Sequence, residues 1–509
     1  MRAAVRLCVA AIGLSLAGCA VGPNYHAPKN DAPQSFVAPA PGVAVPADAG
    51  SGSGVDLARW WRSLGDPELD SLVERAVRAN PDILIALERL QEVREKEVVL
   101  AGDALPEIEA SAAAGRGTGS DMSRAGASPA LRAADNKGNL NQIKQVAGFA
   151  AFWEIDLFGG YRRAIEAGRA DIAAAAAARN AVLISVIADV ARNYVDLRGL
   201  QARLAILQQN IDTARELRDL EQTRYDRGLT NELNLQLAIR EFETLQSDYA
   251  PLQGQLQATQ YDIAVLLGEY PEQLAAELDA VNPIPSLPAG VAPGLPLDVL
   301  QRRPDVREAE RELAAATARI GVATADLFPH VALTGGLGTQ SDTIGSHGSH
   351  IWAFGPAVYW PLLDFGALDA TVSIADHQAR ERLLAYRKTV IGAVQDADAA
   401  IADYSAQTQR LGSLANAMQA SERAVSLARQ RYQRGLTDFL NVVDAERQQY
   451  TLEAEYTSAQ QGAADAFIYL YRALGGGWES YQSIPPIRLP EPAAIAGFHR
   501  LVAGDDPQK

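Results

Sequence analysis

The strongest constraint on this chain is an internal duplication. Residues 224–230 read RYDRGLT and residues 431–437 read RYQRGLT, an offset of 207 positions (431 − 224). The same offset relates further pairs: Trp153 and Trp360, Phe158 and Phe365, Leu267 and Leu474. Self-similarity that keeps one register over such distances is the sequence signature of a repeated structural unit, so we predict two copies of one unit.

Upstream of the two tryptophans the copies keep a different offset. Pro81 corresponds to Pro304 and Pro106 to Pro329, each 223 positions later. The first copy therefore carries 16 extra residues between Pro106 and Trp153, the difference between 223 and 207. This stretch contains several Gly, Ser and charged residues, which predicts a polar surface loop, where an insertion costs little.

Each copy predicts one shorter helix and one very long one. The shorter helices start at a proline, which suits a first turn, and span 81–104 and 304–327. Beyond two extended segments, the helical pattern runs from Gly160 to Tyr225, about 100 Å at 1.5 Å per residue. Its apolar residues recur at steps averaging about 3.5, the period of a coiled coil. They are Leu183, Ile187, Val190, Tyr194, Leu197, Leu200, Leu204, Leu207, Ile211, Ala214 and Leu217.

A glycine in each repeated run, Gly228 or Gly435, permits the chain to reverse tightly. A second helical stretch then returns to Leu267 in the first copy and to Leu474 in the second. Because the connection is short, the two helices of each copy must lie antiparallel. Each copy is therefore predicted to form a long helical hairpin.

The extended segments have the length and alternation of tilted transmembrane strands. They lie at 106–115, 146–157, 329–339 and 351–363. In the last segment the large apolar residues share one parity: Trp352, Phe354, Val358, Trp360 and Leu362. A soluble sheet is the alternative. After the N-terminal segment no uninterrupted run of 18 or more apolar residues occurs, so a membrane crossing is expected to use strands.

Two copies supply four strands, which cannot close into a barrel. An open sheet edge cannot sit in lipid, because its backbone groups would have no hydrogen-bond partners there. The chain is therefore expected to complete a barrel by associating with further copies. The sequence patterns alone do not give the number of copies.

The N-terminus resembles a bacterial lipoprotein signal. Arg2 and Arg6 precede an apolar run that is too short to span a bilayer, and Leu-Ala-Gly leads directly to Cys19. An ordinary secretory signal with a chance cysteine is the alternative. In lipoprotein signals the cysteine becomes the lipidated first residue, and Ala20 in place of an aspartate implies sorting to the outer membrane.

Charge and composition exclude several classes of function. The formal net charge is −16, so there is no electrostatic reason to bind nucleic acid. Cys8 and Cys19 are the only cysteines, and the first lies in the signal, so the mature chain has no disulfide. The Gly-rich run at 115–119 lacks the context of a phosphate loop, and His347 and His350 fit a solvated loop better than a metal site. We expect no enzyme activity, no cofactor and no metal.

The chain resembles the TolC-like outer-membrane factors, and within them the lipoprotein branch, which serves RND tripartite efflux systems. The matching features, which cover roughly 19–478, are the lipoprotein signal followed by VGPNY, the pair Trp60–Trp61, the twin Arg-Tyr-x-x-Gly turns, LQRRPDV at 300–306 and YRALGGGW at 471–478. The resemblance implies a mainly α protein with a transmembrane β-barrel. It further implies a trimeric 12-stranded barrel, four strands per chain, continuous with a long antiparallel coiled-coil tunnel.

The predicted organisation has six parts. They are a signal peptide (1–18), a lipid-anchored N-terminal segment (19–60), a first repeat (61–268), a Pro-rich linker (269–296), a second repeat (297–475) and a C-terminal tail (476–509).

The resemblance also assigns site residues. A pore gate is implied at Leu440, Asp444 and Arg447, whose i, i+4, i+7 spacing puts them on one helix face. A solvated helix face with an ordinary ion pair is the alternative. Adaptor-docking tips are implied at Arg227, Gly228, Leu229, Thr230, Arg434, Gly435, Leu436 and Thr437. Plain hairpin turns are the alternative there.

The function implied is a passive exit duct for small molecules in the outer membrane, lipid-anchored through Cys19 and extending into the periplasm. Its partners would be two further copies of the chain, a periplasmic adaptor protein, an inner-membrane RND transporter and outer-membrane lipid. Two alternatives stay open, a type I protein secretion duct and a periplasmic coiled-coil scaffold without a pore. The sequence does not identify the substrate.

Overall fold

The computed structural model describes residues 20–29, 56–116, 143–288, 300–341 and 348–481. The chain divides into two compact units. The first comprises Met1–Asp31, Glu88–Ala178 and Asp305–Ile391, and the second Ala32–Leu87, Arg179–Pro304 and Gly392–Lys509. The inserted loop of the first copy, Cys19 and most of the C-terminal tail lie outside the described residues.

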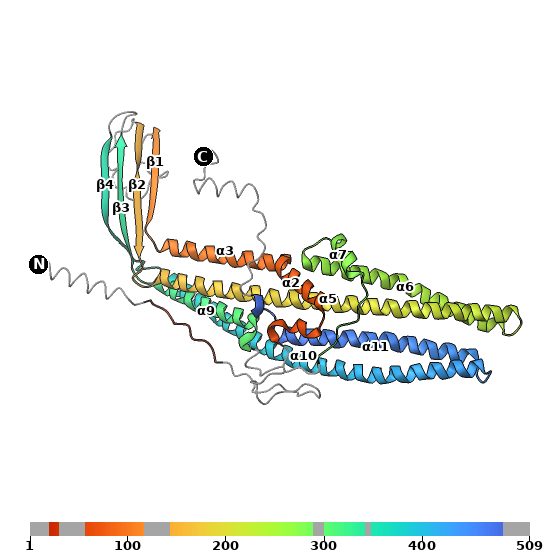
Figure 1. Cartoon of the computed structure of the whole chain (residues 1–509). Coiled ribbons are helices and arrows are strands. Elements are labelled where there is room, and N and C mark those ends of the chain that lie inside the picture. The colour runs from red at the N-terminus through yellow and green to blue at the C-terminus, as the bar shows by residue number, and fades with distance from the viewer. Residues whose placement is uncertain (1–19, 30–55, 117–142, 289–299, 342–347, 482–509) are drawn as a thin grey trace. The chain divides into compact units, whose positions relative to one another are not determined.

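Long helices dominate the described residues (Figure 1). In chain order the helices are η1 (Leu57–Leu64), α2 (Pro67–Ala79), α3 (Pro81–Asp103), α5 (Gly160–Asp226), α6 (Glu232–Leu267), α7 (Pro271–Leu278), α9 (Pro304–Ala325), α10 (Ala367–Gln433), α11 (Phe439–Ala473) and η3 (Glu479–Tyr481). The long helices α5 and α10 are 67 residues each, and both ends of α10 follow those of α5 by the offset of 207. The duplication predicted from sequence is therefore confirmed in the fold.

The four strands form one antiparallel sheet in the order β1-β2-β3-β4. Their bounds are β1 Glu107–Arg116, β2 Ile143–Ile155, β3 His330–Ser341 and β4 Ser349–Tyr359. Glu107 pairs with Phe152 in the first copy, and His330 pairs with Tyr359 in the second. These two pairs are related by the offsets 223 and 207, so both hairpins have the same register.

One face of the sheet carries nearly all of its exposed large apolar side chains. The register puts even positions of β1 and β4 on the same face as odd positions of β2 and β3. That face presents Ile108, Phe149, Trp153, Leu333, Leu337, Trp352, Phe354 and Val358, all exposed. Phe152 lies on the opposite face with Glu154. An apolar face of this size suits lipid contact, as the alternation in the sequence predicted.

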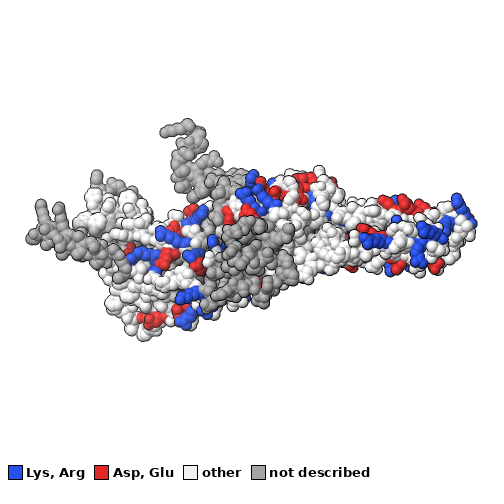
Figure 2. Space-filling view, turned by 60° about the horizontal axis from the view of Figure 1, so that its bottom comes forward, with Lys and Arg blue, Asp and Glu red and all other residues white. Residues whose placement is uncertain are grey.

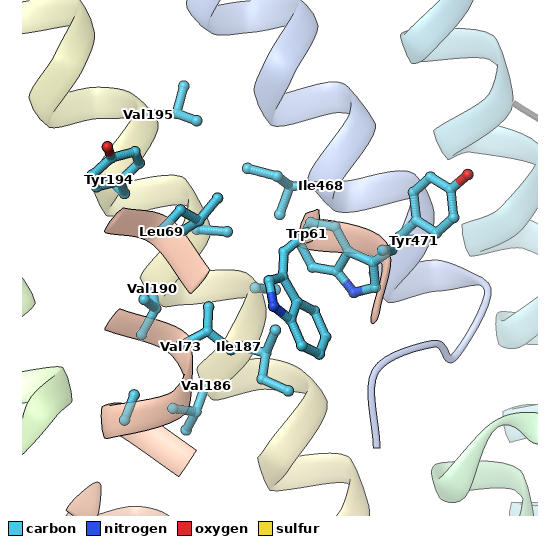
Figure 3. Close-up of a cluster of buried hydrophobic side chains, with 14 of the residues drawn as sticks. Trp61, Leu69, Val73, Val186, Ile187, Val190, Tyr194, Val195, Ile468 and Tyr471 are labelled. Carbon is cyan, nitrogen blue, oxygen red and sulfur yellow. The ribbon is translucent and has the colours of Figure 1, made fainter. Parts of the chain in front are cut away.

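The second unit holds the largest hydrophobic core (Figure 3). Trp60 and Trp61 are almost fully buried, with ring centroids 5.9 Å apart at 84°. Trp60 also stacks on Tyr471, and α2 packs Leu69 and Val73 against the valine and isoleucine side chains of α5. The helix α2 was not predicted from the sequence, and α7 occupies part of the predicted 269–296 linker. Asp66 caps α2 by accepting hydrogen bonds from the first-turn amides at 2.9 and 3.4 Å.

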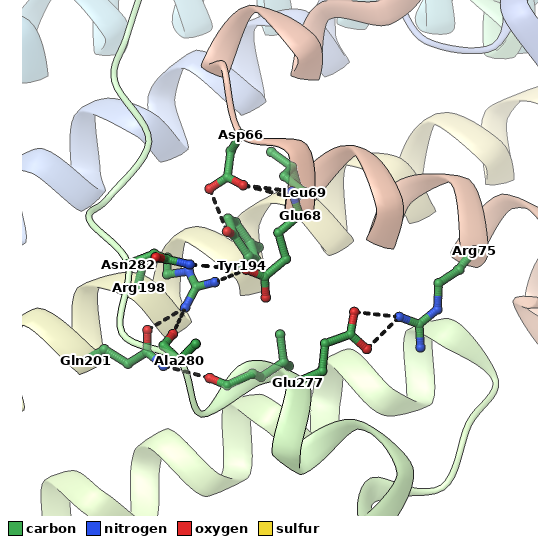
Figure 4. A network of polar contacts seen from close by, with 11 residues as sticks. Asp66, Glu68, Leu69, Arg75, Tyr194, Arg198, Gln201, Glu277, Ala280 and Asn282 are labelled. Carbon is green, nitrogen blue, oxygen red and sulfur yellow. Dashed lines mark hydrogen bonds and ion pairs between the residues drawn. The ribbon is translucent and has the colours of Figure 1, made fainter.

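A buried polar network ties α2 to α5 (Figure 4). The Arg198 guanidinium is fully buried and contacts Glu68 at 2.5 Å. It also donates to the Ala280 carbonyl at 2.6 Å and to Gln201 at 2.7 Å. Burial raises the pKa of Glu68, and Arg198 opposes that rise. The network therefore fixes the start of α2 and the chain after α7 onto one turn of α5.

By length and composition, α5 contains one window apolar enough to cross a membrane, with a mean hydropathy of 1.5. A third of that window is buried within the protein.

Candidate functional site

Both hairpin ends close with the same backbone geometry. Gly228 and Gly435 have φ of +72° and +69°, a region that glycine occupies without strain. Leu229 N donates to the Arg224 carbonyl at 2.8 Å, and Leu436 N to the carbonyl 207 positions later, that of Arg431, at 2.9 Å. The twin sequence runs therefore form twin helix C-caps that reverse the chain, as predicted.

The side chains of the predicted tip residues lie at these ends. Leu229 and Leu436 are exposed, as are Arg227 and Arg434. The predicted docking residues are Arg227, Gly228, Leu229, Thr230, Arg434, Gly435, Leu436 and Thr437. In both copies the threonine hydroxyl accepts a hydrogen bond from an asparagine of the next helix, at 3.0 and 2.9 Å. Figure 2 shows charged residues of both signs over the hairpin ends.

The predicted gate residues share one exposed face at the start of α11. Leu440 is 57% exposed, and Arg447 lies 3.7 Å from Asp444, both side chains facing solvent. Phe439 and Val443 point the other way, into a small cluster with side chains of the first hairpin. The geometry therefore brings the three residues to one surface and leaves that surface free within the described chain.

Sequence reasoning missed a polar contact between the two hairpins near their ends. Glu221 is fully buried, and its Oε1 accepts hydrogen bonds from the Tyr432 hydroxyl at 2.9 Å and from Arg224 at 3.3 Å. Arg224 also donates to the Tyr432 hydroxyl, and its guanidinium lies 5.0 Å from that ring. Burial, and then the bond to Glu221, raises the pKa of Tyr432 to about 12. Glu221, Arg224 and Tyr432 are called the hairpin clamp below.

One signal in the sequence pointed to the clamp. Arg224 and Tyr432 belong to the repeated runs, but the counterpart of Glu221 at the offset of 207 is Ala428. A charged residue on a helix whose repeat carries alanine marks a place where the two copies differ in chemistry.

A second built site holds the segment that follows the predicted lipidation cysteine. Val21 N donates to the Phe158 carbonyl at 3.0 Å. The buried Arg163 side chain donates to the Val21 carbonyl at 3.1 Å, the Gly22 carbonyl at 3.3 Å and Asn24 Oδ1 at 2.8 Å. One arginine thus satisfies three acceptors of an extended segment.

Glycine and tyrosine complete this contact. Gly22 crosses Gly321 so closely that a Cβ on Gly22 would lie 2.4 Å from the Gly321 Cα. The Tyr25 hydroxyl donates to Glu310 at 2.8 Å. These contacts account for the VGPNY motif. Cys19 itself lies outside the described residues, so its lipidation stays a prediction.

Comparison with known proteins decides the family. The family model described as "Outer membrane efflux protein" matches residues 72–269 and 295–476, one match in each copy. This chain belongs to the outer membrane efflux protein family. The resemblance inferred from the motifs is confirmed.

Relatives and solved structures agree along almost the whole chain. Nodulation protein T of Rhizobium leguminosarum bv. trifolii is 29% identical over 469 residues, which cover 91% of this chain and 96% of the relative. Cation efflux system protein CusC of Escherichia coli O6:H1 is 28% identical over 479 residues, covering 92% and 98%. The structure of the outer-membrane channel OprN matches with a TM-score of 0.79 and 33% identity, covering 90% of this chain and 100% of that one. The predicted fold class is confirmed: a duplicated, mainly helical chain whose four-stranded sheet and helical hairpins are those of an outer-membrane channel.

Proposed function

We propose that this protein is the outer-membrane channel of a tripartite efflux pump and conducts small molecules passively from the periplasm to the exterior. The observation that carries the proposal is one sheet with an apolar face and two open edges, followed by duplicated helical hairpins, in a member of the outer membrane efflux protein family. Names of relatives support it, since CusC is named for cation efflux. A conduit of this kind performs no bond chemistry, so we propose that it is not an enzyme.

Three copies are proposed to form the channel. Each chain supplies four antiparallel strands, and neither outer edge of its sheet has a partner among the described residues. Three copies give 12 strands, well above the roughly eight at which closed outer-membrane barrels begin. The anchored segment after Cys19 would hold the lipid at the end of β2, because Val21 bonds to Phe158 there.

The gate is proposed to form where α11 begins. Around a threefold axis, three copies of Leu440 would narrow the bore, and three copies of Asp444 would repel one another unless Arg447 or a cation compensates them. The hairpin clamp would hold α10 against α5 in the closed state. Glu221 of α5 is buried there, and it bonds to Tyr432 of α10 and to Arg224 of its own helix.

Docking partners are proposed to be a periplasmic adaptor and, through it, an inner-membrane RND transporter. Exposed leucines at the two hairpin ends lie among charged residues and would give the adaptor apolar contacts at a polar surface.

Single-channel conductance in planar bilayers tests the channel and its gate. Wild-type protein should conduct rarely, and the double variant Asp444→Ala, Arg447→Ala should raise the open probability at least several-fold. A matched control is Asp212→Ala, Arg215→Ala, which removes an exposed pair of the same i, i+3 spacing from α5. If no variant conducts, the channel proposal is wrong, and if both double variants behave as wild type, the gate is elsewhere.

A further inference from the structure

The sheet has one seam between the two copies inside the chain and two edges that are left open. The internal seam is the pairing of β2, from the first copy, with β3, from the second. β1 and β4 form the outer edges, and neither has a second neighbour in the described part of the sheet. The counterpart of β2 is β4 and the counterpart of β3 is β1, so the duplication relates the internal seam to a pairing of these two edges.

Applied to the β2–β3 register of the internal seam, the repeat offsets give a specific register for the two open edges, β4 and β1. In the internal seam Ala151 pairs with Gly335 and Ile155 with Val331. Adding 207 to the β2 position and subtracting 223 from the β3 position places Val358 opposite Ala112, and Leu362 opposite Ile108. The same two offsets already relate the β1–β2 register to the β3–β4 register without a slip.

Residue chemistry agrees with that register. Leu362 and Ile108 are 75% and 72% exposed, and they take the place of the apolar pair Ile155 and Val331. Tyr359 would face Ser111, an aromatic opposite a hydroxyl, as Phe152 faces Thr334 in the internal seam. β4 also ends at Tyr359, three residues before the counterpart of the β2 terminus, as expected of a strand whose second partner is absent.

An aromatic contact beside the sheet has an equally open counterpart. Phe158 stacks on Phe328 with ring centroids 4.6 Å apart. Their counterparts are Phe365, which is 91% exposed, and Leu105, which is 64% exposed. Phe365 has a φ of +55°, an uncommon value for a bulky side chain. The repeat offsets make Leu105, which directly precedes the opposite edge strand, the residue that corresponds to its stacking partner.

The helices next to the sheet show the same complementarity in size. A Cβ on Gly160 would lie 3.3 Å from the Ala325 methyl, so this internal contact pairs a glycine with an alanine. The counterparts are Ala367 and Gly102, the same two sizes exchanged, and a Cβ on Gly102 would meet nothing within 4 Å. The surface beside Gly102 is therefore open, and a neighbouring copy could place Ala367 there as Ala325 lies beside Gly160 in the internal contact.

We propose that β4 of one copy pairs antiparallel with β1 of the next copy in the register that sets Val358 opposite Ala112, and that Phe365 packs on Leu105 of that next copy. The partner is a second copy of this chain, and the inference rests on the proposed channel. It goes beyond the number of copies, because it specifies which residues meet across each interface.

Disulfide cross-linking tests the register with the full-length protein in outer membranes. Cys19 is the only cysteine of the predicted mature chain, so introduced pairs have no competing thiol once Cys19 carries lipid. The variants Val358→Cys, Ala112→Cys and Leu362→Cys, Ile108→Cys should form covalent oligomers on mild oxidation. Tyr359→Cys, Ser111→Cys samples the other class of antiparallel pair, since hydrogen-bonded and non-hydrogen-bonded positions alternate.

The same substitutions recombined provide the control. Val358→Cys with Ile108→Cys and Leu362→Cys with Ala112→Cys are four residues out of register, about 13 Å along the strand. That separation exceeds the reach of a disulfide, about 7 Å between Cα atoms, so these variants should remain uncross-linked. Cross-linking that favours the recombined pairs, or a Val358→Cys, Ala110→Cys pair, would overturn the register.

Two further readouts separate this inference from the proposed function. A protein that is trimeric by light scattering and conducts, yet cross-links only out of register, refutes the register and leaves the channel standing. A monomer without conductance refutes both. Phe365→Ala and Leu105→Ala should each lower the temperature at which the trimer dissociates in SDS, and the double variant should fall no further than the worse single one. Additive losses would show that the two side chains do not touch.

Discussion

Replacing Arg198 by methionine perturbs the buried network of the second unit at its centre. The guanidinium is 0% exposed and ties Glu68 at 2.5 Å to the Ala280 carbonyl at 2.6 Å. Methionine fills a similar volume and supplies neither the charge nor the donors. The Glu68 carboxylate would then be partly buried without compensation, with Oε1 already lacking a partner.

Breaking one side of a buried ion pair costs about 3–5 kcal/mol. At about 2 °C per kcal/mol, the thermal midpoint should fall by about 6–10 °C. Arg215→Met removes one side of an exposed pair and should cost no more than about 1 kcal/mol. The double variant Arg198→Met, Glu68→Gln should recover part of the loss, because the neutral amide needs no counter-charge.

The loss should also depend on pH with a defined sign. Burial raises the pKa of Glu68 and Arg198 lowers it, so the variant leaves that pKa higher than in the wild type. An acid whose folded pKa is raised destabilises the fold once it ionises, so the loss should shrink as pH falls towards 4 and grow towards 8. Thermal melts followed by circular dichroism at 222 nm in detergent measure both effects. A midpoint that moves by less than about 2 °C at pH 8, or a loss independent of pH, would refute the reasoning.

Three other outcomes are expected. Gly228→Val with Gly435→Val forces a branched side chain into positive φ at both tips and should abolish adaptor co-purification while the trimer still forms, which pull-down and light scattering measure. Burial, and then a neighbouring aspartate, raises the pKa of Asp465 to about 7, so the contribution of Asp465 to stability should be lost as pH rises from 4 to 7, and Asp465→Asn should gain stability relative to the wild type over that range in thermal melts. Arg163→Ala removes three hydrogen bonds to the segment after Cys19 and should speed trypsin cleavage at Lys29 several-fold without loss of trimer; an unchanged cleavage rate would show that the arginine does not hold the segment.

Much of the fold follows from two offsets that are visible in the sequence. The proline that starts each shorter helix, the tryptophan in each strand pair and the glycine of each turn are local signals, and their spacing carries one copy onto the other. The Trp153 indole donates to the Ala104 carbonyl at 3.1 Å, and the Trp360 indole to the Leu327 carbonyl at 3.1 Å, related by those offsets. These local signals and their repetition therefore predicted the order of the long helices and strands and the approximate bounds of the helices, but the pairing register of the strands was not predicted.

Contacts between distant polar side chains were not predictable in the same way. Tyr432 and Glu221 are 211 positions apart, and neither has a local pattern that names its partner. The pairing depends on which faces of α5 and α10 meet, and a coiled-coil period specifies a face without specifying the facing residue. The helix α2 was missed for a different reason, since its signals are local: Asp66 caps it, Pro67 starts it, and its buried apolar residues recur on one face at Leu69, Leu72, Val73, Ala76 and Val77.

Differences between the copies separate the internal seam from the one proposed between chains. Gly321 allows Gly22 to cross at close contact, whereas its counterpart Val98 would fill that space, so the segment after Cys19 fits the internal seam. Glu221 closes the hairpin clamp within the chain, whereas its counterpart Ala428 leaves the equivalent place between chains without a carboxylate. Duplication alone would make six equivalent seams around a trimer. In the proposed trimer these substitutions would make the seams alternate, with the segment after Cys19 and the polar clamp on the seams inside each chain and neither feature on the seams between chains.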